Sequence, residues 1–187
     1  MRSILPLFAA AFLACAPALA DELVAVPAFR SVELRGGGAV EVLPGPAQRV
    51  AILEGSSRFT RIYVENEGQL RIDTCAQPCP SDYRLRVEIR SPRAPSLAID
   101  GGGRIVTGSG FSSQRQLSVA VNGGGHIDAR SIDAMHVSAA VNGGGNIIVR
   151  PQDALSAAVN GGGHIRYLGN PTTAVAIRGG GDVSRGD

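Results

Sequence analysis

"VNGGGHI", residues 121–127, contains the pattern that decides the fold of this chain. Its first five letters return at 141–145 and again at 159–163. Each glycine of a folded chain loses more backbone freedom than alanine does, at a cost of roughly 0.5–1 kcal/mol. Three copies of a glycine triplet therefore indicate either a backbone geometry that glycine alone adopts easily or a ligand that contacts bare backbone.

The glycine triplet belongs to a longer unit, and the chain carries six aligned copies of that unit. They are LRGGGAV (34–40), IDGGGRI (99–105), VNGGGHI (121–127), VNGGGNI (141–147), VNGGGHI (159–165) and IRGGGDV (177–183). The positions two before and two after each triplet are aliphatic in every copy. From the second copy onward the spacing is about 20 residues, which is typical of repeat architectures.

Short strands flank the triplets. In LSVAVN (117–122), Leu117, Val119 and Val121 lie on one face and the small residues Ser118 and Ala120 on the other. This period of two indicates β-strands, and no helical period of 3.6 occurs in the rest of the chain. Strands and glycine turns at this spacing predict a β-solenoid with aliphatic columns inside and stacked triplets, with φ above zero, in its turns.

The N-terminal half is less regular but has the same alternation. We predict strands at 49–54, 61–65, 69–73 and 83–90, with hairpin-like returns between them. No linker rich in proline, serine or charge divides the chain. Residues 21–187 are therefore expected to form one domain.

Residues 1–20 have the pattern of a secretory signal peptide. Arg2 precedes an apolar stretch at 4–16, and Ala-Leu-Ala at 18–20 is a small-x-small cleavage site. We expect cleavage before Asp21 and export to the periplasm or cell surface of a bacterium; lipidation at Cys15 is the alternative. No later segment has the roughly 18 apolar residues that a membrane-spanning helix needs.

Cys75 and Cys79 are the two cysteines that remain after cleavage. An oxidising compartment favours a disulfide between them, stabilising by about 2 kcal/mol in the chain-entropy model. A redox pair or a metal clip is the alternative, but redox pairs favour a two-residue spacing beside a helix.

Composition excludes several classes of function. The chain has no lysine, which a P-loop phosphate site and a Schiff-base enzyme both need, and no tryptophan. Its near-neutral charge and few aromatic residues do not fit a nucleic-acid partner. We expect no cofactor and no metal.

The chain resembles the GIN-domain family, known as an auto-transporter adhesin head domain. The features that carry the resemblance are FRSVELRGGGAVEVLPG (29–45), LRVEIRSPRAPSLAIDGGGRI (85–105), serial Gly-x-Gly units, and Tyr167-Leu168-Gly169-Asn170-Pro171 near the end. The resemblance covers nearly all of 27–185. It implies a right-handed parallel β-helix and an exported location, and it implies no catalytic residues. The chain departs from the family in having Gly-Gly-Gly where Gly-Ser-Gly is common.

One column beside the triplets is the candidate site. Asn122, Asn142 and Asn160 are expected to form a ladder along the turns, with side-chain amides bonding from turn to turn. His126, Asn146 and His164 occupy the column that follows the triplets. A metal site would need both histidines about 2.1 Å from one ion, yet a repeat separates them, so exposed turn residues are favoured.

Arg84, Arg86 and Arg90 alternate along one predicted strand, with Arg93 nearby. Such a group could bind an anionic glycan or lipid headgroup, but Glu88 interrupts it and a solvated face is favoured.

These observations predict an all-β protein: a right-handed parallel β-helix, or β-solenoid, with a less regular N-terminal β portion. The predicted function is an exported, non-catalytic, adhesin-like envelope scaffold whose flat surface binds an envelope glycan or protein. A carbohydrate-active lyase or hydrolase on the same fold is one alternative, and a structural protein that assembles end to end is another.

Overall fold

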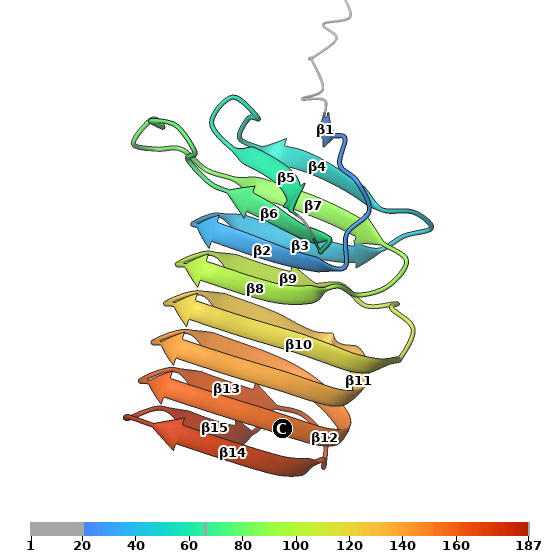
Figure 1. The fold of residues 1–187 in the computed structure, drawn as a ribbon, viewed down its shortest axis with the longest axis vertical. Coiled ribbons are helices and arrows are strands. Elements are labelled where there is room, and N and C mark those ends of the chain that lie inside the picture. Colours follow the sequence, from blue (N-terminus) through green and yellow to red (C-terminus); the bar gives the residue numbers. More distant parts are fainter. Residues whose placement is uncertain (1–20, 66, 187) are drawn as a thin grey trace, which may run out of the picture.

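A computed structural model describes residues 21–65 and 67–186 of the chain. The predicted signal peptide, residues 1–20, lies outside these described residues. The described part is all β, with no helix, and contains 15 strands (Figure 1). The strands are β1 (Glu22–Val24), β2 (Ser31–Gly36), β3 (Ala39–Pro44), β4 (Arg49–Glu54), β5 (Arg61–Glu65), β6 (Gln69–Asp73), β7 (Arg86–Ser91), β8 (Ser96–Gly101), β9 (Arg104–Thr107), β10 (Gln114–Gly123), β11 (His126–Gly143), β12 (Asn146–Gly161), β13 (His164–Tyr167), β14 (Thr172–Arg178) and β15 (Asp182–Arg185).

The prediction of a right-handed parallel β-helix is wrong. All 15 strands belong to one mixed sheet, nearly closed and barrel-like, in which most neighbours are parallel. Three pairs are antiparallel: β1 with β4, β4 with β7, and β5 with β6. The period-two alternation of side chains predicted the strands at 49–54, 61–65 and 69–73 correctly. Such alternation does not reveal the direction in which a neighbouring strand runs.

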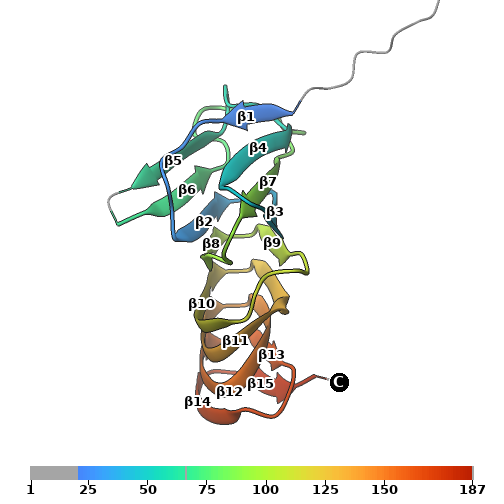
Figure 2. The ribbon, with the colours of Figure 1, turned by 90° about the vertical axis from the view of Figure 1, so that its right-hand side faces the viewer.

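The sheet is continuous because β11 passes from one layer to the other. Its sequence, HIDARSIDAMHVSAAVNG, contains neither glycine nor proline before its last residue, and the pairing with β12 shifts register between Ala129 and Asp133 and between Ala134 and His136. Its first part pairs with β9 and its second part with β10. One path through the sheet therefore runs β1-β4-β7-β3-β9-β11-β10-β8-β2-β6-β5. Off this path, β12 pairs with β11, β13 and β14, and β13 pairs with β15; the two layers are seen edge-on in Figure 2.

The aliphatic columns fill the space between the layers. In the column before the triplets, Leu34, Ile99 and Val121 are at most 2% exposed, and Val141 and Val159 are equally buried. The column after them is buried from Val40 to Ile165. Equivalent residues pair in register, for example Val121 with Val141 and Ile127 with Ile147. Burial of these columns is the main source of stability in such a fold.

The three glycines of a triplet have different roles. Gly143, the first of its triplet, has φ of +117°, and a Cβ there would lie 2.6 Å from the carbonyl oxygen of Gly123. A Cβ on Gly144 would have no atom within 4 Å. A Cβ on Gly145 would collide with the Val121 side chain and lie 2.8 Å from the carbonyl oxygen of Gly125. The prediction that all three glycines bend with φ above zero is therefore wrong for this triplet, since only Gly143 does so.

The two ends of the molecule differ. Antiparallel strands β1, β4, β5 and β6 lie over the N-terminal end (Figures 1 and 2). At the other end, every residue of β14 is exposed, and β14 pairs only with β12 among the described strands. Val175 is 48% and Ile177 44% exposed, although both belong to columns that are buried in the preceding strand.

Candidate functional site

The asparagines of the predicted column lie next to one another in space. Asn122 pairs in register with Asn142, and Asn142 with Asn160, along the edge formed by the triplets. At its upper end the side-chain amide of Asn122 donates to Oδ1 of Asp100 at 3.3 Å, and Arg35 contacts Oδ2 of Asp100 at 3.1 Å. No hydrogen bond between asparagine side chains of this column occurs in the part of the chain that the structure describes.

The second column aligns His126, Asn146 and His164 in register, with Arg104 before them. Burial lowers the pKa of His126, and the positive charge of Arg104 lowers it further. Within residues 21–65 and 67–186, no three His, Cys, Asp or Glu side chains lie close enough together to hold a metal ion.

The outer face beside this edge carries small side chains. Ser118, Ser138 and Ser156 stand in one column, and Ala120, Ala140 and Ala158 stand in the next. Each serine is exposed, since its neighbours along the strand point into the core. Together with the asparagine column they form a flat surface over β10, β11 and β12, which we call the outer face.

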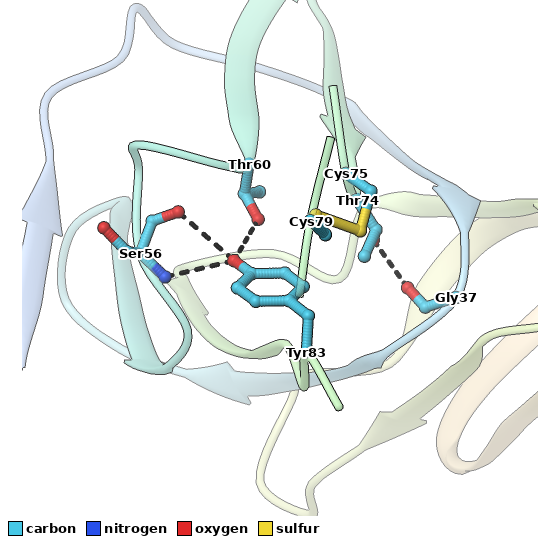
Figure 3. The surroundings of a disulfide bond; sticks show 7 residues. All are labelled: Gly37, Ser56, Thr60, Thr74, Cys75, Cys79 and Tyr83. Atoms are coloured by element: carbon cyan, nitrogen blue, oxygen red, sulfur yellow. Dashed lines mark hydrogen bonds between the residues drawn. A yellow bond between two sulfur atoms is a disulfide. The ribbon is translucent and has the colours of Figure 1, made fainter. Parts of the chain in front are cut away.

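The predicted disulfide is confirmed: Cys75 and Cys79 are bonded, with Cα atoms 5.5 Å apart (Figure 3). The loop that it closes follows β6 and is fixed to the first glycine triplet. Thr74 donates from its hydroxyl to the carbonyl oxygen of Gly37 at 2.6 Å. The disulfide therefore stiffens a loop that contacts the turn between β2 and β3.

A hydroxyl network beside the disulfide escaped the sequence analysis. The phenol oxygen of Tyr83 lies 2.7 Å from Oγ1 of Thr60 and accepts a hydrogen bond from the backbone N–H of Ser56 at 3.1 Å (Figure 3). It also donates to the carbonyl oxygen of Ser56 at 3.2 Å. Thr60 is buried, at 3% exposed. No local motif connects these residues, so only the fold reveals the network.

The arginines of the 84–93 segment do not act together. Arg86 pairs with Glu41 at 3.6 Å, and Arg90 pairs with Glu88 at 2.7 Å. Neighbouring carboxylates thus neutralise this strand, as expected for a solvated face. Arg93 lies beyond the end of β7, away from these pairs.

A groove opens where Arg93 lies, at the edge opposite the triplets. Its volume is about 860 Å³. Segments before β2, between β3 and β4, between β7 and β8, and around the start of β10 contribute to it. The lining residues are Phe29, Arg30, Gln48, Ser91, Pro92, Arg93, Ala94, Pro95, Ser112, Ser113, Gln114, Arg115 and Gln116. The sequence analysis did not find this groove, because its residues are scattered over four segments.

One side chain fixes the floor of the groove. The amide of Gln48 accepts from the backbone N–H of Phe29 at 3.0 Å and donates to its carbonyl oxygen at 2.6 Å. Phe29 is 4% exposed and packs into the core. The segment that carries Arg30 is therefore held in place from both sides, since Arg30 also donates its backbone N–H to Gly68 at 2.7 Å.

Among the described residues, no helix is long and apolar enough to cross a membrane.

Comparisons with known proteins support the family resemblance that the sequence motifs indicate. None of the curated proteins compared with the chain is significantly similar to it. The chain is similar in structure to a "putative adhesin" from Bacteroides fragilis, with 16% identity, a TM-score of 0.53, and coverage of 91% of this chain and 98% of the other. It is also similar to a "putative lipid binding protein" from Parabacteroides distasonis, with 16% identity, a TM-score of 0.39, and coverage of 90% and 96%. At these identities the first likeness shows the fold alone. Residues 108–171 match the family model "Putative auto-transporter adhesin, head GIN domain", which confirms the resemblance to the GIN-domain family over this segment.

Proposed function

We propose that the chain is an exported, non-catalytic, adhesin-like protein of the bacterial envelope that binds an extended partner on its outer face. The family match at 108–171 and the fold shared with an adhesin-type protein support this role. The partner is an envelope glycan or an envelope protein. Residues 21–187 act as one domain after removal of residues 1–20.

The observation that carries the proposal is the register of the outer face. Parallel pairing repeats the same hydroxyl and amide groups from strand to strand, at Ser118, Ser138 and Ser156 and at Asn122 and its equivalents. Neighbouring strands are about 4.8 Å apart. A flat row of small polar groups at regular spacing allows close approach by an extended polymer, whose own repeat can match it.

A blocking variant tests this surface. Ser138→Arg places a long charged side chain in the middle of the outer face, and we expect it to abolish binding to any glycan or envelope protein that the mature chain captures on an array. Ser184→Arg is the matched control, because Ser184 pairs with Arg166 on the opposite layer. Equal binding by the two variants would disprove the location. Turnover of a glycan or ester by the purified protein would disprove the non-catalytic assignment.

Export has its own test. The chain is expressed with its first 20 residues in a bacterial host, and the mature N-terminus is sequenced. We expect Asp21 as the first residue and recovery from the periplasm or cell surface. Retention of residues 1–20 in the cytoplasm would contradict the proposal.

Self-assembly through the C-terminal end is a second candidate, favoured by the exposure of Val175 and Ile177. The occupant that fits this end is a second copy of the chain. A two-fold axis perpendicular to both layers would pair β14 with the partner's β14 and β15 with the partner's β15, antiparallel in each case. Such an isologous contact would cover the exposed aliphatic residues and the open strand edges together.

Light scattering after size exclusion, over a range of concentrations, tests this candidate. We expect a dimer for the native chain and a monomer for Ile177→Lys. Ala176→Lys is the control, since Ala176 pairs with the exposed Ala158 and points outward from the same strand. A native chain that stays monomeric at every concentration would refute the assembly.

A further inference from the structure

The groove opposite the triplets has an unusual balance of charge. Arg30, Arg93 and Arg115 line it, and no aspartate or glutamate does. The whole chain, by contrast, has 18 basic and 16 acidic residues. Three positive charges from three separate segments therefore meet at one concave surface without a carboxylate among the lining residues.

The arginines of the groove are also available for binding. Among the described residues, neither Arg93 nor Arg115 forms an ion pair or a side-chain hydrogen bond, unlike Arg86 and Arg90 on the neighbouring strand. Arg30 donates to a neutral acceptor, the carbonyl oxygen of Glu67 at 3.0 Å. All three side chains are exposed. An arginine that lacks a carboxylate partner keeps its planar set of donors for a carboxylate or phosphate, which it can bind through two parallel hydrogen bonds.

The rest of the groove indicates the kind of molecule that carries the anion. Ser112, Ser113, Gln114 and Gln116 add hydroxyl and amide groups near the arginines. These are suitable partners for sugar hydroxyls. Phe29, the only aromatic residue of the lining, is buried and therefore offers little of its ring for stacking against a neutral sugar.

The dimensions fit a short oligosaccharide. Pockets for small molecules commonly have volumes of about 300–1,000 Å³, and the groove has about 860 Å³. Its floor is fixed by the two hydrogen bonds between Gln48 and the backbone of Phe29. The ligand would therefore enter a largely preformed site.

We propose that this groove is a second binding site, which takes an acidic oligosaccharide whose carboxylate or phosphate groups contact Arg93 and Arg115. Arg30 supplies a third positive charge, and the serine and glutamine side chains hydrogen-bond to the sugar hydroxyls. The lining of the groove ends at Gln116 in β10 and the outer face begins at Ser118 in the same strand, so the two sites share no residue and each can fail without the other.

Calorimetric titration of residues 21–187 with trigalacturonate, maltotriose and inorganic phosphate tests the proposal. We expect trigalacturonate to bind, with an affinity that falls as salt rises. Maltotriose, which has the same number of sugar rings and no charge, should not bind measurably. Inorganic phosphate should bind at least tenfold more weakly than trigalacturonate, because it lacks the sugar hydroxyls. Binding of maltotriose or phosphate as tight as that of trigalacturonate, or no binding of trigalacturonate, would overturn the proposal.

A double variant locates the site. Arg93→Gln with Arg115→Gln removes two exposed charges, so the fold should be kept, and we expect at least a tenfold loss of affinity for trigalacturonate. The matched control is Arg166→Gln with Arg178→Gln, which removes the same charge near the other end of the molecule. Equal losses in the two double variants would overturn the location. Ser138→Arg should leave trigalacturonate binding unchanged, which separates this test from that of the outer face.

Discussion

The stacking of the first glycine of each triplet makes a sharp prediction for Gly143→Ala. An alanine would have to adopt φ of +117°, at a cost of about 1–3 kcal/mol. Its Cβ would lie 2.6 Å from the carbonyl oxygen of Gly123, which accepts the hydrogen bond from Gly144 N–H at 3.0 Å. Displacing that carbonyl weakens a bond that contributes about 1 kcal/mol. Alanine also lowers the conformational entropy of the unfolded chain, which stabilises the folded state by about 0.4–1 kcal/mol.

The free energy of unfolding should therefore fall by about 1–3.5 kcal/mol in Gly143→Ala. For a domain of this size that corresponds to a loss of roughly 2–14 °C in Tm. Far-ultraviolet circular dichroism during heating measures it, since the chain has no tryptophan. Gly144→Ala is the matched control: a Cβ there meets no atom within 4 Å, so its Tm should stay level or rise by about 1–4 °C. Equal shifts in the two variants would refute the stacking argument.

Three further predictions concern the disulfide, a hydroxyl network and a histidine. Replacing Cys75 and Cys79 by serine should lower the free energy of unfolding by about 2 kcal/mol in urea denaturation, and reductant should destabilise the native chain alone. Tyr83→Phe should cost about 1–3 kcal/mol in the same assay, because it leaves Thr60 and Ser56 without a shared partner, whereas Tyr83→Leu should cost more through lost packing. The lowered pKa of His126 favours its neutral form in the folded state, so stability should decline as pH falls below the unfolded value of about 6.5, and His126→Asn should remove that part of the decline.

The sequence predicted much of the local structure. Alternation located β4, β5 and β6, and the aligned triplets identified the residues that pair from strand to strand, such as Val121 with Val141. Two cysteines four residues apart, in a chain expected to be exported to an oxidising compartment, were enough to predict their bond. These features depend on residues that are close in the chain or on an exact repeat, and both can be recognised in the amino-acid sequence.

What the sequence could not supply was how strands far apart are joined. The alternation in β11 shifts phase between Ala129 and Ile132 and again between Ala134 and Val137. The sequence does not reveal whether such a shift ends the strand or bends it, and the structure shows that the strand continues. That continuity, with the antiparallel pairing of β4 and β7, makes one mixed sheet instead of a β-helix. The Tyr83 network and the groove were not predicted for the same reason, because their residues come together only after folding.

The two edges of the molecule are under different physical constraints, and this difference bears on where specificity can arise. At the triplet edge, a Cβ on Gly143 or Gly145 would collide with the neighbouring triplet, so the backbone there has little freedom to change. At the opposite edge, residues 92–95 and 108–113 lie outside the strands, where Figure 1 shows them as loops. Loops of this kind tolerate changes in length and sequence without cost to the core. Proteins with the same triplets can therefore differ at the groove, and ligand choice is expected to depend on its loop residues, such as Arg93, Ser112 and Ser113, more than on the asparagine column.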